Sequence, residues 1–511
     1  MRIGVLLPSE QQKNQAGVRI RYLRIQEALA RLGVRLELVP IQDFTSRTTF
    51  VHDLYLVSKC YDARAVVAAH MLRGLGKPVG VDLFDDYFSQ VADSRFVRLR
   101  HWLKALLDRS SFALCSTPAM RQVACQYAPG LPVHVMNDPA RPTGIPALAG
   151  SLRRKVDFAR ENRCLDLAWF GMGDNPNFPV GLEDLVAFGG ELAQLRGHGF
   201  QINFTILTNR RALTQESLTA LKRLPLSYRI EEWTEEREQS LLASSLLCFL
   251  PVNGQSFSTA KSLNRAVTAL SAGAQVLSVG FPLYAAFSGL IYRDARQFMA
   301  DLVRGELLLR GDTLPLLARL LAEYADIDRE SAALAAFLEA IPGPAKPTPS
   351  KGGVAVIHGK ETLGDIHKFT QRMGGLSVAS PFTSANLHYD LCFNFTTGGT
   401  GFDVRVSAQK SAALPAEARS LLRPDTGGVA GQYMLFESAR LYPDIHVSGA
   451  ALAEAGSPCA DAAAYPPVMH GVSRVLERLF PGVACVHAEQ SKWLPWHVRG
   501  AGGEGMGLPR P

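Results

Sequence analysis

KSLNRAVTALSAGAQVLSVGFPLYAAF, residues 261–287, carries the clearest structural signal in the chain. Apolar residues recur at helical spacing over Ala260–Ser271, Gly273 follows as a helix stop, and Gln275–Ser278 has the pattern of a short buried strand. Parallel strands need a crossover connection between them, and that connection is usually a helix. A helix that leads directly into a buried strand therefore predicts one step of a parallel α/β sheet.

The same alternation of strand and helix extends outward over most of the chain. Strands are predicted in a first group at Ile3–Leu7, Val34–Val39, Asp53–Val57, Pro78–Leu83, Phe112–Cys115 and Val133–Met136, and in a second group at Asp166–Phe170, Gln201–Leu207, Leu226–Ile230, Leu246–Pro251 and Gln275–Ser278. Helical patterns lie between them, as at Val18–Leu32, and a loop over Pro139–Gly150 separates the groups. The predicted fold class is therefore α/β, with two doubly wound, Rossmann-like domains of parallel strands.

A chain of 511 residues exceeds what one hydrophobic core usually supports. We predict a first Rossmann-like domain over residues 1–150 and a second over residues 151–340. The stretch IPGPAKPTPSKGG, residues 341–353, has four prolines and little apolar content, which predicts an interdomain linker. The apolar runs VAVIHG and LHYDLCFNF predict a smaller accessory α/β domain over residues 354–499, and the glycine-rich end, residues 500–511, is expected to be disordered.

Charge and composition narrow the class of protein. The chain has 54 Lys and Arg against 47 Asp and Glu, a formal net charge of +7, which favours anionic ligands or peripheral contact with the inner surface of an anionic membrane. The basic residues are scattered and no basic and aromatic stripe is present, which disfavours nucleic acid as a partner. The eight cysteines form no C-x-x-C pair, so they indicate neither a zinc site nor a redox dithiol. Without a long apolar segment or a signal-peptide pattern, we expect a cytoplasmic chain.

The stretch over residues 261–287 resembles the K-S-x-N-R…A-L-x-A-G-x-x-V motif of a bacterial subset of the family-four-like, or group 1, glycosyltransferases, which have the GT-B fold. The order of elements over Met1–Phe337 is similar to that of the same family. The resemblance implies a retaining hexosyltransferase that moves a sugar from a nucleotide diphosphate-sugar to a glycan or lipid-linked acceptor in bacterial surface polysaccharide synthesis. It places the acceptor on the first domain and the donor on the second. It implies no cofactor beyond this co-substrate and no metal bridging the diphosphate.

The donor site is expected where the helix of this motif begins. Backbone N–H groups at a helix start, neighbouring hydroxyls and the Lys261 cation can converge on a diphosphate, and Arg265 adds a second cation. The further donor-binding residues expected here are Ser256, Ser258, Thr259, Asn264 and Tyr284. A solvated helix start with an ordinary N-cap is the alternative interpretation.

A second glycine-rich signal is WFGMGDNPNFPVGLEDL, residues 169–185. Gly171 and Gly173 follow a predicted strand and precede a helix predicted over Leu182–Gln194. In the resembled family the equivalent loop faces the donor phosphates, so both glycines are expected at the donor site. Two glycines after a strand also suit a plain tight turn.

The motif departs from its family at two positions. Typical members carry a glutamate pair, E-x7-E, one beside the donor sugar and one on the ribose, whereas Ala260 and Thr268 stand at those places here. Either Asn264 and Arg265 take over some of these contacts, or donor binding is altered or lost. A catalytically inactive GT-B scaffold that binds nucleotide, sugar or a partner transferase is therefore the alternative function, and a nucleotide-sugar epimerase is a weaker third.

Acidic residues follow the fourth predicted strand. VGVDLFDDYF places Asp82, Asp85 and Asp86 near its carboxyl end, where they could bind Mg²⁺, activate an acceptor hydroxyl or cap a helix. The resemblance disfavours the metal, so Asp85 and Asp86 are expected to orient the acceptor while Lys261 and Arg265 stabilise charge in the reaction. One further basic residue, Lys59, lies at the carboxyl end of the third predicted strand.

Overall fold

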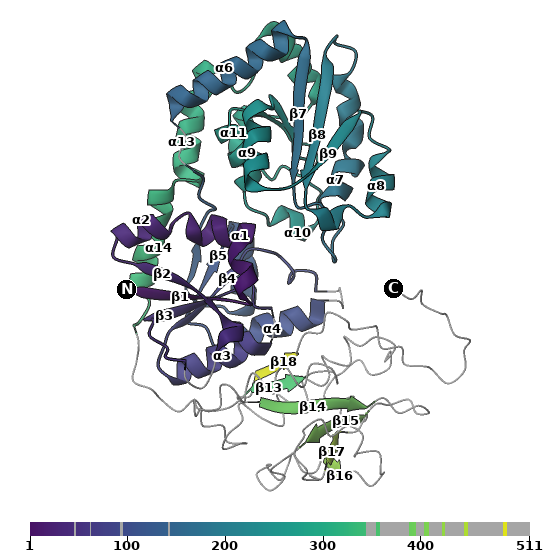
Figure 1. Ribbon diagram of the computed structural model, residues 1–511. Helices are drawn as coiled ribbons and strands as arrows, with labels where there is room; N and C mark the ends of the chain where they lie inside the picture. The colour runs from purple at the N-terminus through teal and green to yellow at the C-terminus, as the bar shows by residue number, and fades with distance from the viewer. Residues whose placement is uncertain are drawn as a thin grey trace, which may run out of the picture.

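The computed structural model describes residues 1–44, 48–61, 63–91, 96–141 and 144–343, together with short strands in the part of the chain that follows. These residues form three six-stranded sheets (Figure 1). The first two sheets are entirely parallel, which confirms the prediction of two doubly wound α/β domains. Within the described ranges, none of the helices combines the length and apolar content that a membrane span requires.

The first sheet has the strand order β2-β1-β3-β4-β5-β6. Its strands are β1 (Arg2–Leu7), β2 (Arg35–Pro40), β3 (Leu54–Ser58), β4 (Val79–Leu83), β5 (Phe112–Cys115) and β6 (Val133–Val135). Every residue of β3, β4 and β5 is buried, because helices cover both faces of the sheet. The continuous apolar runs that predicted these strands follow from that burial.

Helices of the first domain lie on both faces of this sheet. They are α1 (Ala16–Val18), the π-helix η2 (Arg19–Leu23), α2 (Gln26–Arg31), α3 (Ala63–Gly74), α4 (Val97–Leu107) and α5 (Pro118–Tyr127). The single helix predicted over Val18–Leu32 is thus divided into three parts. A π-helical turn inside a helix shifts the side chains that follow it, and such turns are frequent at functional sites.

The second sheet has the order β12-β11-β10-β7-β8-β9. Its strands are β7 (Cys164–Gly171), β8 (Gln201–Thr208), β9 (Tyr228–Glu232), β10 (Leu247–Phe249), β11 (Gln275–Leu277) and β12 (Ile291–Tyr292). Its helices are α7 (Leu182–Ala187), the 3-10 helix η5 (Gly189–Leu195), α8 (Gln215–Leu221), α9 (Glu235–Ser244), α10 (Ser256–Thr259), α11 (Asn264–Ser271) and α12 (Ala295–Arg304).

The start of the helix predicted over Ala260–Ser271 is wrong, which matters for the site. The helix α11 begins only at Asn264, and residues 260–263 separate it from the short α10, which ends at Thr259. The carbonyl oxygen of Ala260 accepts a hydrogen bond from the hydroxyl of Thr117 in the first domain (3.0 Å) instead of from a helix amide. A contact from the other domain thus accompanies the break in the helix.

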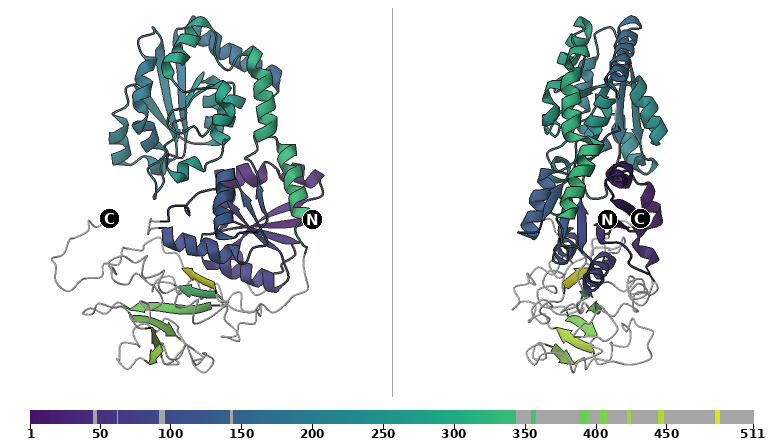
Figure 2. Two further views of the ribbon diagram at one scale, coloured as in Figure 1. Left: turned by 180° about the vertical axis from the view of Figure 1, so that it is seen from behind. Right: turned by 90° about the vertical axis from the view of Figure 1, so that its left-hand side faces the viewer.

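Three further helices lie outside the two sheets: α6 (Ile145–Glu161), α13 (Leu314–Tyr324) and α14 (Ile327–Glu339). The helices α13 and α14 run from the second domain to the first along one side of the molecule, and α6 lies at the far end of the second domain (Figure 1, Figure 2). The helix α6 replaces the end of the loop predicted through Gly150. Although the predicted second domain of residues 151–340 includes α14, its buried Leu334 and Leu338 lie in the core of the first domain beside Val5.

The third sheet mixes parallel and antiparallel pairs in the order β16-β17-β15-β14-β13-β18. Its strands are β13 (Val354–Ile357), β14 (His388–Asn394), β15 (Asp403–Ser407), β16 (Leu422–Pro424), β17 (Asp444–Val447) and β18 (Ala484–His487). The strands β13 and β18 lie beside α3 and α4 of the first domain (Figure 1). The two strands predicted from VAVIHG and LHYDLCFNF coincide with β13 and β14. Most of the predicted linker and the predicted tail lie outside the described residues.

Candidate functional site

Both parallel sheets have a topological switch point. In the first sheet β1 lies between β2 and β3, and in the second sheet β7 lies between β8 and β10. Loops that follow the two central strands at such a point run in opposite directions, and doubly wound sheets bind ligands in the space that this leaves at the carboxyl edge. Residues 8–17 and Lys59 follow β1 and β3, and Gly171 and residues 250–263 follow β7 and β10.

The carboxyl edges of the two sheets face each other. Polar contacts join segments that follow strands of the first sheet to segments that follow strands of the second. The contacts are Lys261 to Asp85, Ser262 to Asp138, Thr117 to the carbonyl of Ala260, Gln90 to Ser256 and Arg19 to Glu235. Of the residues that the sequence singled out, Lys261, Ser256 and Asp85 are therefore brought to one interface.

Lys261 and Asp85 form an ion pair across this interface. The Lys261 ammonium group donates to Oδ1 of Asp85, and its Nζ lies 3.9 Å from the ring centre of Phe257. Burial acts to raise the pKa of Asp85, but the ammonium groups of Lys261 and Lys59 outweigh burial, so this pKa lies below its ordinary value. Asp85 is therefore a carboxylate that neutralises a cation of the expected donor site.

Lys59 lies next to the same carboxylate. Its backbone is left-handed, with φ of 55°, and its Nζ lies 4.5 Å from the ring centre of Phe84, the residue before Asp85. Burial lowers the pKa of Lys59, while the nearby Asp85 favours its charged form. Gly17 approaches it closely, since a Cβ at that position would lie 2.9 Å from the Lys59 Nζ. The glycine thus leaves room for the ammonium group.

Arg265 belongs to α11, and its side chain reaches the carboxyl end of β7 in the second sheet. Its guanidinium donates to the carbonyl oxygen of Phe170 and lies over the Trp169 ring, 5.2 Å from the ring centre. Gly171 has φ of 146°, and a Cβ there would lie 3.3 Å from Cζ of Arg265. Within the described residues, Nε of Arg265 is buried without a hydrogen-bond partner. The arginine and this glycine are therefore neighbours.

Gly173 belongs to a tight turn. Its N–H donates to Oδ1 of Asn209 (2.8 Å), and its carbonyl oxygen accepts from the N–H of Leu182 (2.9 Å). Gly181 has φ of 78°, and a Cβ there would lie 2.6 Å from the backbone of Gly173. These contacts close the turn between β7 and α7 and use the polar groups of Gly173 internally.

The hydroxyls expected at the donor site already have protein contacts. The hydroxyl of Ser256 accepts from Nε2 of Gln90 (3.3 Å), and that of Thr259 donates to the carbonyl oxygen of Ser256 (3.2 Å). Ser258 is buried. Ser258 is therefore shielded from a ligand, whereas Ser256 is partly exposed and its hydroxyl can still donate.

The remaining expected residues lie on both sides of the interface. Asn264 is the first residue of α11 and is partly exposed. Tyr284 is buried in the core of the second domain, and burial raises its pKa. Oδ1 of Asp86 accepts from the N–H groups of Phe88 (3.0 Å) and Ser89 (2.9 Å). Asp86 therefore stabilises the turn after β4 rather than the start of the next described helix, α4, which begins at Val97.

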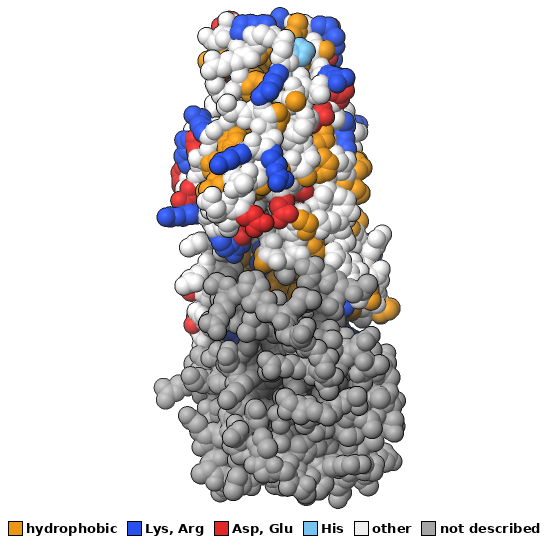
Figure 3. Space-filling view, turned by 90° about the vertical axis from the view of Figure 1, so that its right-hand side faces the viewer, with side chains coloured by type: hydrophobic (Ala, Val, Ile, Leu, Met, Phe, Trp, Pro, Cys, Tyr) orange, Lys and Arg blue, Asp and Glu red, His pale blue; other side chains and the backbone are white. Residues whose placement is uncertain are grey.

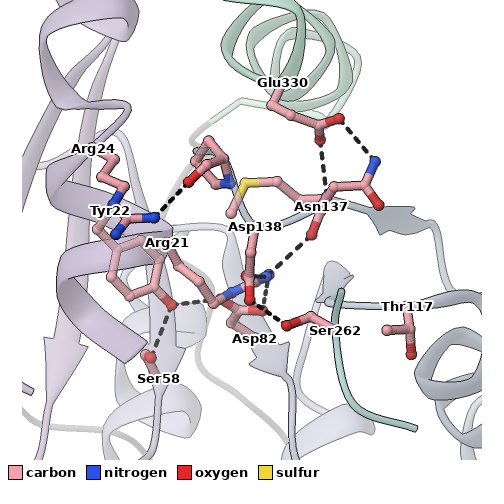
Figure 4. A network of polar contacts seen from close by, with 12 residues as sticks. Arg21, Tyr22, Arg24, Ser58, Asp82, Thr117, Asn137, Asp138, Ser262 and Glu330 are labelled. Carbon is pink, nitrogen blue, oxygen red and sulfur yellow. Dashed lines mark hydrogen bonds and ion pairs between the residues drawn. The ribbon is translucent and has the colours of Figure 1, made fainter. Parts of the chain in front are cut away.

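A buried network around Arg21 was not predicted from the sequence (Figure 4). Arg21, at 1% exposure, donates twice to Asp82 (2.8 and 2.7 Å), and also to the carbonyl oxygen of Met136 (3.1 Å) and to Asp138 (3.0 Å). The hydroxyl of Tyr22 donates to Asp82 (2.6 Å). Burial acts to lower the pKa of Arg21, but the two carboxylates outweigh burial and raise it. A carboxylate inside the apolar strand VGVDL was the available signal, since a buried charge requires a partner.

This network reaches the expected donor segment. The second carboxylate oxygen of Asp138 accepts from the hydroxyl of Ser262 (2.6 Å), which is the residue next to Lys261 (Figure 4). The neighbouring Asn137 donates through its backbone and its side chain to Glu330 of α14, both at 2.9 Å. Asp138 therefore connects Ser262 of the second domain to the buried Arg21 of the first.

Two further contacts hold the domains together. Phe178, from the loop after β7, is stacked on Phe257 (4.3 Å) and Phe96 (5.1 Å) and belongs to the core of the first domain. Glu235, at the start of α9, forms ion pairs with Arg19 and Arg141. The two domains thus share both an aromatic and an ionic contact.

The charges at the interface suit an anion. Lys59 and Lys261 act on one carboxylate, Asp85, and Arg265 adds a cation at the end of β7, whereas Asp82 and Asp138 are used by Arg21. No group of His, Cys, Asp and Glu able to hold a metal occurs among the described residues. On the outer face shown in Figure 3, basic side chains are dispersed among other types, so on that face the net charge forms no single basic patch.

No protein-family model matches the sequence, and no curated protein matches it. Solved structures with a similar chain arrangement include Anabaena HepE in complex with UDP, with 13% identity, 66% of this chain and 100% of that chain covered, and a TM-score of 0.47. A second, named trehalose-6-phosphate from E. coli bound with UDP-2-fluoro glucose, has 11% identity, coverage of 67% and 100%, and a TM-score of 0.42. A third is a trehalose-6-phosphate synthase described in terms of glycosyl transfer with retention, with 13% identity, coverage of 57% and 75%, and a TM-score of 0.40.

Proposed function

We propose that the chain is a glycosyltransferase that moves a sugar from a nucleotide diphosphate-sugar to an acceptor hydroxyl. One observation carries the proposal: the carboxyl edges of two doubly wound sheets face each other, and cations from both edges gather between the two switch points. The motif that begins at Lys261 supports the same function through its resemblance to glycosyltransferases.

The donor diphosphate would lie between the start of α11 and the end of β7. Lys261 and Arg265 supply positive charge there, and the first N–H groups of α11 have no acceptor within their own helix. Gly171 lets the chain approach Arg265 closely. The donor side is therefore assigned to the second domain and the acceptor side to the first.

The chemistry requires charge stabilisation more than acid–base catalysis. The bond between C1 of the donor sugar and the diphosphate oxygen breaks, and a bond from C1 to the acceptor oxygen forms. The acceptor proton passes to the leaving phosphate oxygen, and the cations around it stabilise the negative charge that develops there. The acceptor attacks on the face of the sugar that the diphosphate leaves, so the configuration at C1 is retained. The proposed donor sugar is a hexose, and the proposed acceptor is a glycan or a lipid-linked sugar in bacterial surface polysaccharide synthesis.

A catalytically inactive scaffold is the second candidate. Ala260 stands where the resembled family has a glutamate, is only 3% exposed and contacts the first domain through its carbonyl. This position offers a donor sugar neither a carboxylate nor an accessible side chain. A chain that binds the nucleotide sugar without transferring it would be consistent with that arrangement.

Incubation of the full chain with a panel of labelled nucleotide sugars, without acceptor, separates these functions. Slow hydrolysis that is lost in Lys261→Met supports the transferase. Binding without hydrolysis supports the scaffold, and inversion at the second carbon of the sugar would indicate an epimerase. If no nucleotide sugar binds, the proposed function is wrong.

A further inference from the structure

Lys59 has the features of a ligand-binding lysine. It follows β3 directly, at the switch point of the first sheet, in a left-handed conformation that is strained for a non-glycine residue. In the part of the chain that the structure describes, no hydrogen bond or ion pair engages its ammonium group. The fold therefore holds a strained, partly buried cation against the Phe84 ring with its hydrogen-bonding capacity unused among the described residues.

The Lys59 ammonium group is held between neighbours from two segments and feels the charges of Asp85 and Lys261. Phe84 lies against it on one side and Gly17 on another. Asp85 and Lys261 are the two charged groups that act on it most strongly. Two lysines, one from each domain, thus act on a single carboxylate, and one of them, Lys261, is in direct contact with it.

We propose that Lys59 and Lys261 together form a binding site for a phosphoryl anion that spans the two domains, and that the carboxylate of Asp85 occupies this site when no ligand is bound. The inference rests on the proposed function, because a nucleoside diphosphate is the first source of such a group. A phosphorylated acceptor is the second source.

The charges of Lys59 and Lys261 favour replacement of the Asp85 carboxylate by a phosphoryl anion. Two ammonium groups around one carboxylate leave an excess of positive charge, which the two or more charges of a bound phosphoryl group would offset. Asp85 and the ligand compete for the same donors. Loss of the Asp85 charge should therefore strengthen anion binding, while loss of the Lys59 charge should weaken it.

Titration calorimetry of the full chain tests this with inorganic pyrophosphate, a nucleoside diphosphate and a hexose phosphate. We expect Lys59→Met to bind about tenfold more weakly, as for loss of one charge-assisted contact, and Asp85→Asn to bind about tenfold more tightly. Glu235→Gln is the matched control, because it removes another carboxylate that pairs across the same interface with Arg19 and Arg141. Its affinity should stay within about twofold of the wild type. The gain of affinity in Asp85→Asn is a result that misfolding cannot produce.

The outcomes separate this inference from the proposed function. If Lys261→Met loses binding while Lys59→Met and Asp85→Asn bind like the wild type, the donor site stands and the two-lysine site is wrong. If the wild type binds none of the three probes, the proposed function is wrong as well. An effect of Lys59→Met on pyrophosphate and nucleoside diphosphate assigns the site to the donor, and an effect on the hexose phosphate alone assigns it to the acceptor.

Discussion

Replacement of Arg21 by methionine should destabilise the first domain by about 3–5 kcal/mol, the usual result of removing one partner of a buried ion pair. Arg21 and Asp82 are each 1% exposed, and the arginine supplies Asp82 with two hydrogen bonds. In Arg21→Met the carboxylate remains buried without its cation. The cost of burying this negative charge is avoided if the carboxylate takes up a proton. For a carboxyl group with an ordinary pKa of about 3.9, this costs about 4 kcal/mol at pH 7.

That cost makes the destabilisation depend on pH in a defined direction. A carboxyl group that is protonated in the folded variant and ionised in the unfolded chain gives stability that is lost as the pH rises. The deficit of Arg21→Met relative to the wild type should therefore shrink by up to about 1.4 kcal/mol for each pH unit between 7 and 5. The double variant Arg21→Met/Asp82→Asn removes the charge and should recover most of the deficit at pH 7.

Urea unfolding at pH 7 and pH 5, followed by circular dichroism and by tryptophan fluorescence, measures this. Trp102, buried in the first domain, gives the fluorescence signal of interest. A deficit that is equal at both pH values and is not relieved by Asp82→Asn would refute the reasoning, because the buried charge would then not be its cause.

Three further predictions concern the interface and its support. Phe178→Ala should lower the free energy of unfolding by about 3–4 kcal/mol, because this ring of the second domain lies in the core of the first. It should also increase the radius of gyration in X-ray scattering, and Phe281→Ala, at an exposed position, is the control. Lys155→Met should cost about 1–3 kcal/mol in thermal unfolding, because Nζ donates at 2.6 Å to the carbonyl oxygens of Leu242 and Ala272, whereas the exposed Arg154→Met should have little effect. Because the pKa of Asp85 is lowered in the folded chain, its ionised form stabilises the fold at pH values above the ordinary pKa of about 3.9. This contribution is lost as the pH falls through the folded pKa. Between pH 5 and 3 the free energy of unfolding of the wild type should therefore fall more steeply than that of Asp85→Asn.

The central strands of both parallel sheets could be predicted because burial on both faces leaves a continuous apolar run. The same criterion missed β12 (Ile291–Tyr292), since two residues form no pattern and this strand is defined by pairing with Val276 and Leu277. It also missed the start of α6, where proline at the first turn of a helix resembles a loop signal. The break before α11 involves Thr117 of the other domain, which no local pattern contains.

For the site, the sequence identified individual residues but not the distant residues with which they pair. Lys261, Arg265 and Asp85 were identified from strand ends and one motif; the structure pairs Lys261 with Asp85 and places Arg265 against Phe170 of its own domain. That Asp85 pairs with Lys261, 176 residues away in the sequence, was not predictable from spacing. The pairing of Asp82 with Arg21 was likewise missed, although a carboxylate in a buried strand indicated that some cation must meet it.

The most direct test of the central claim is the affinity of the full chain for nucleoside diphosphates, measured by calorimetry for the wild type, Lys261→Met and Asp85→Ala. If the facing carboxyl edges form a donor site, the wild type binds, and Lys261→Met binds about 10- to 100-fold more weakly, as expected for loss of a charge-assisted contact of about 1.5–3 kcal/mol. Asp85→Ala should bind at least as tightly as the wild type. Equal affinity of the wild type and Lys261→Met would contradict the assignment of the donor site.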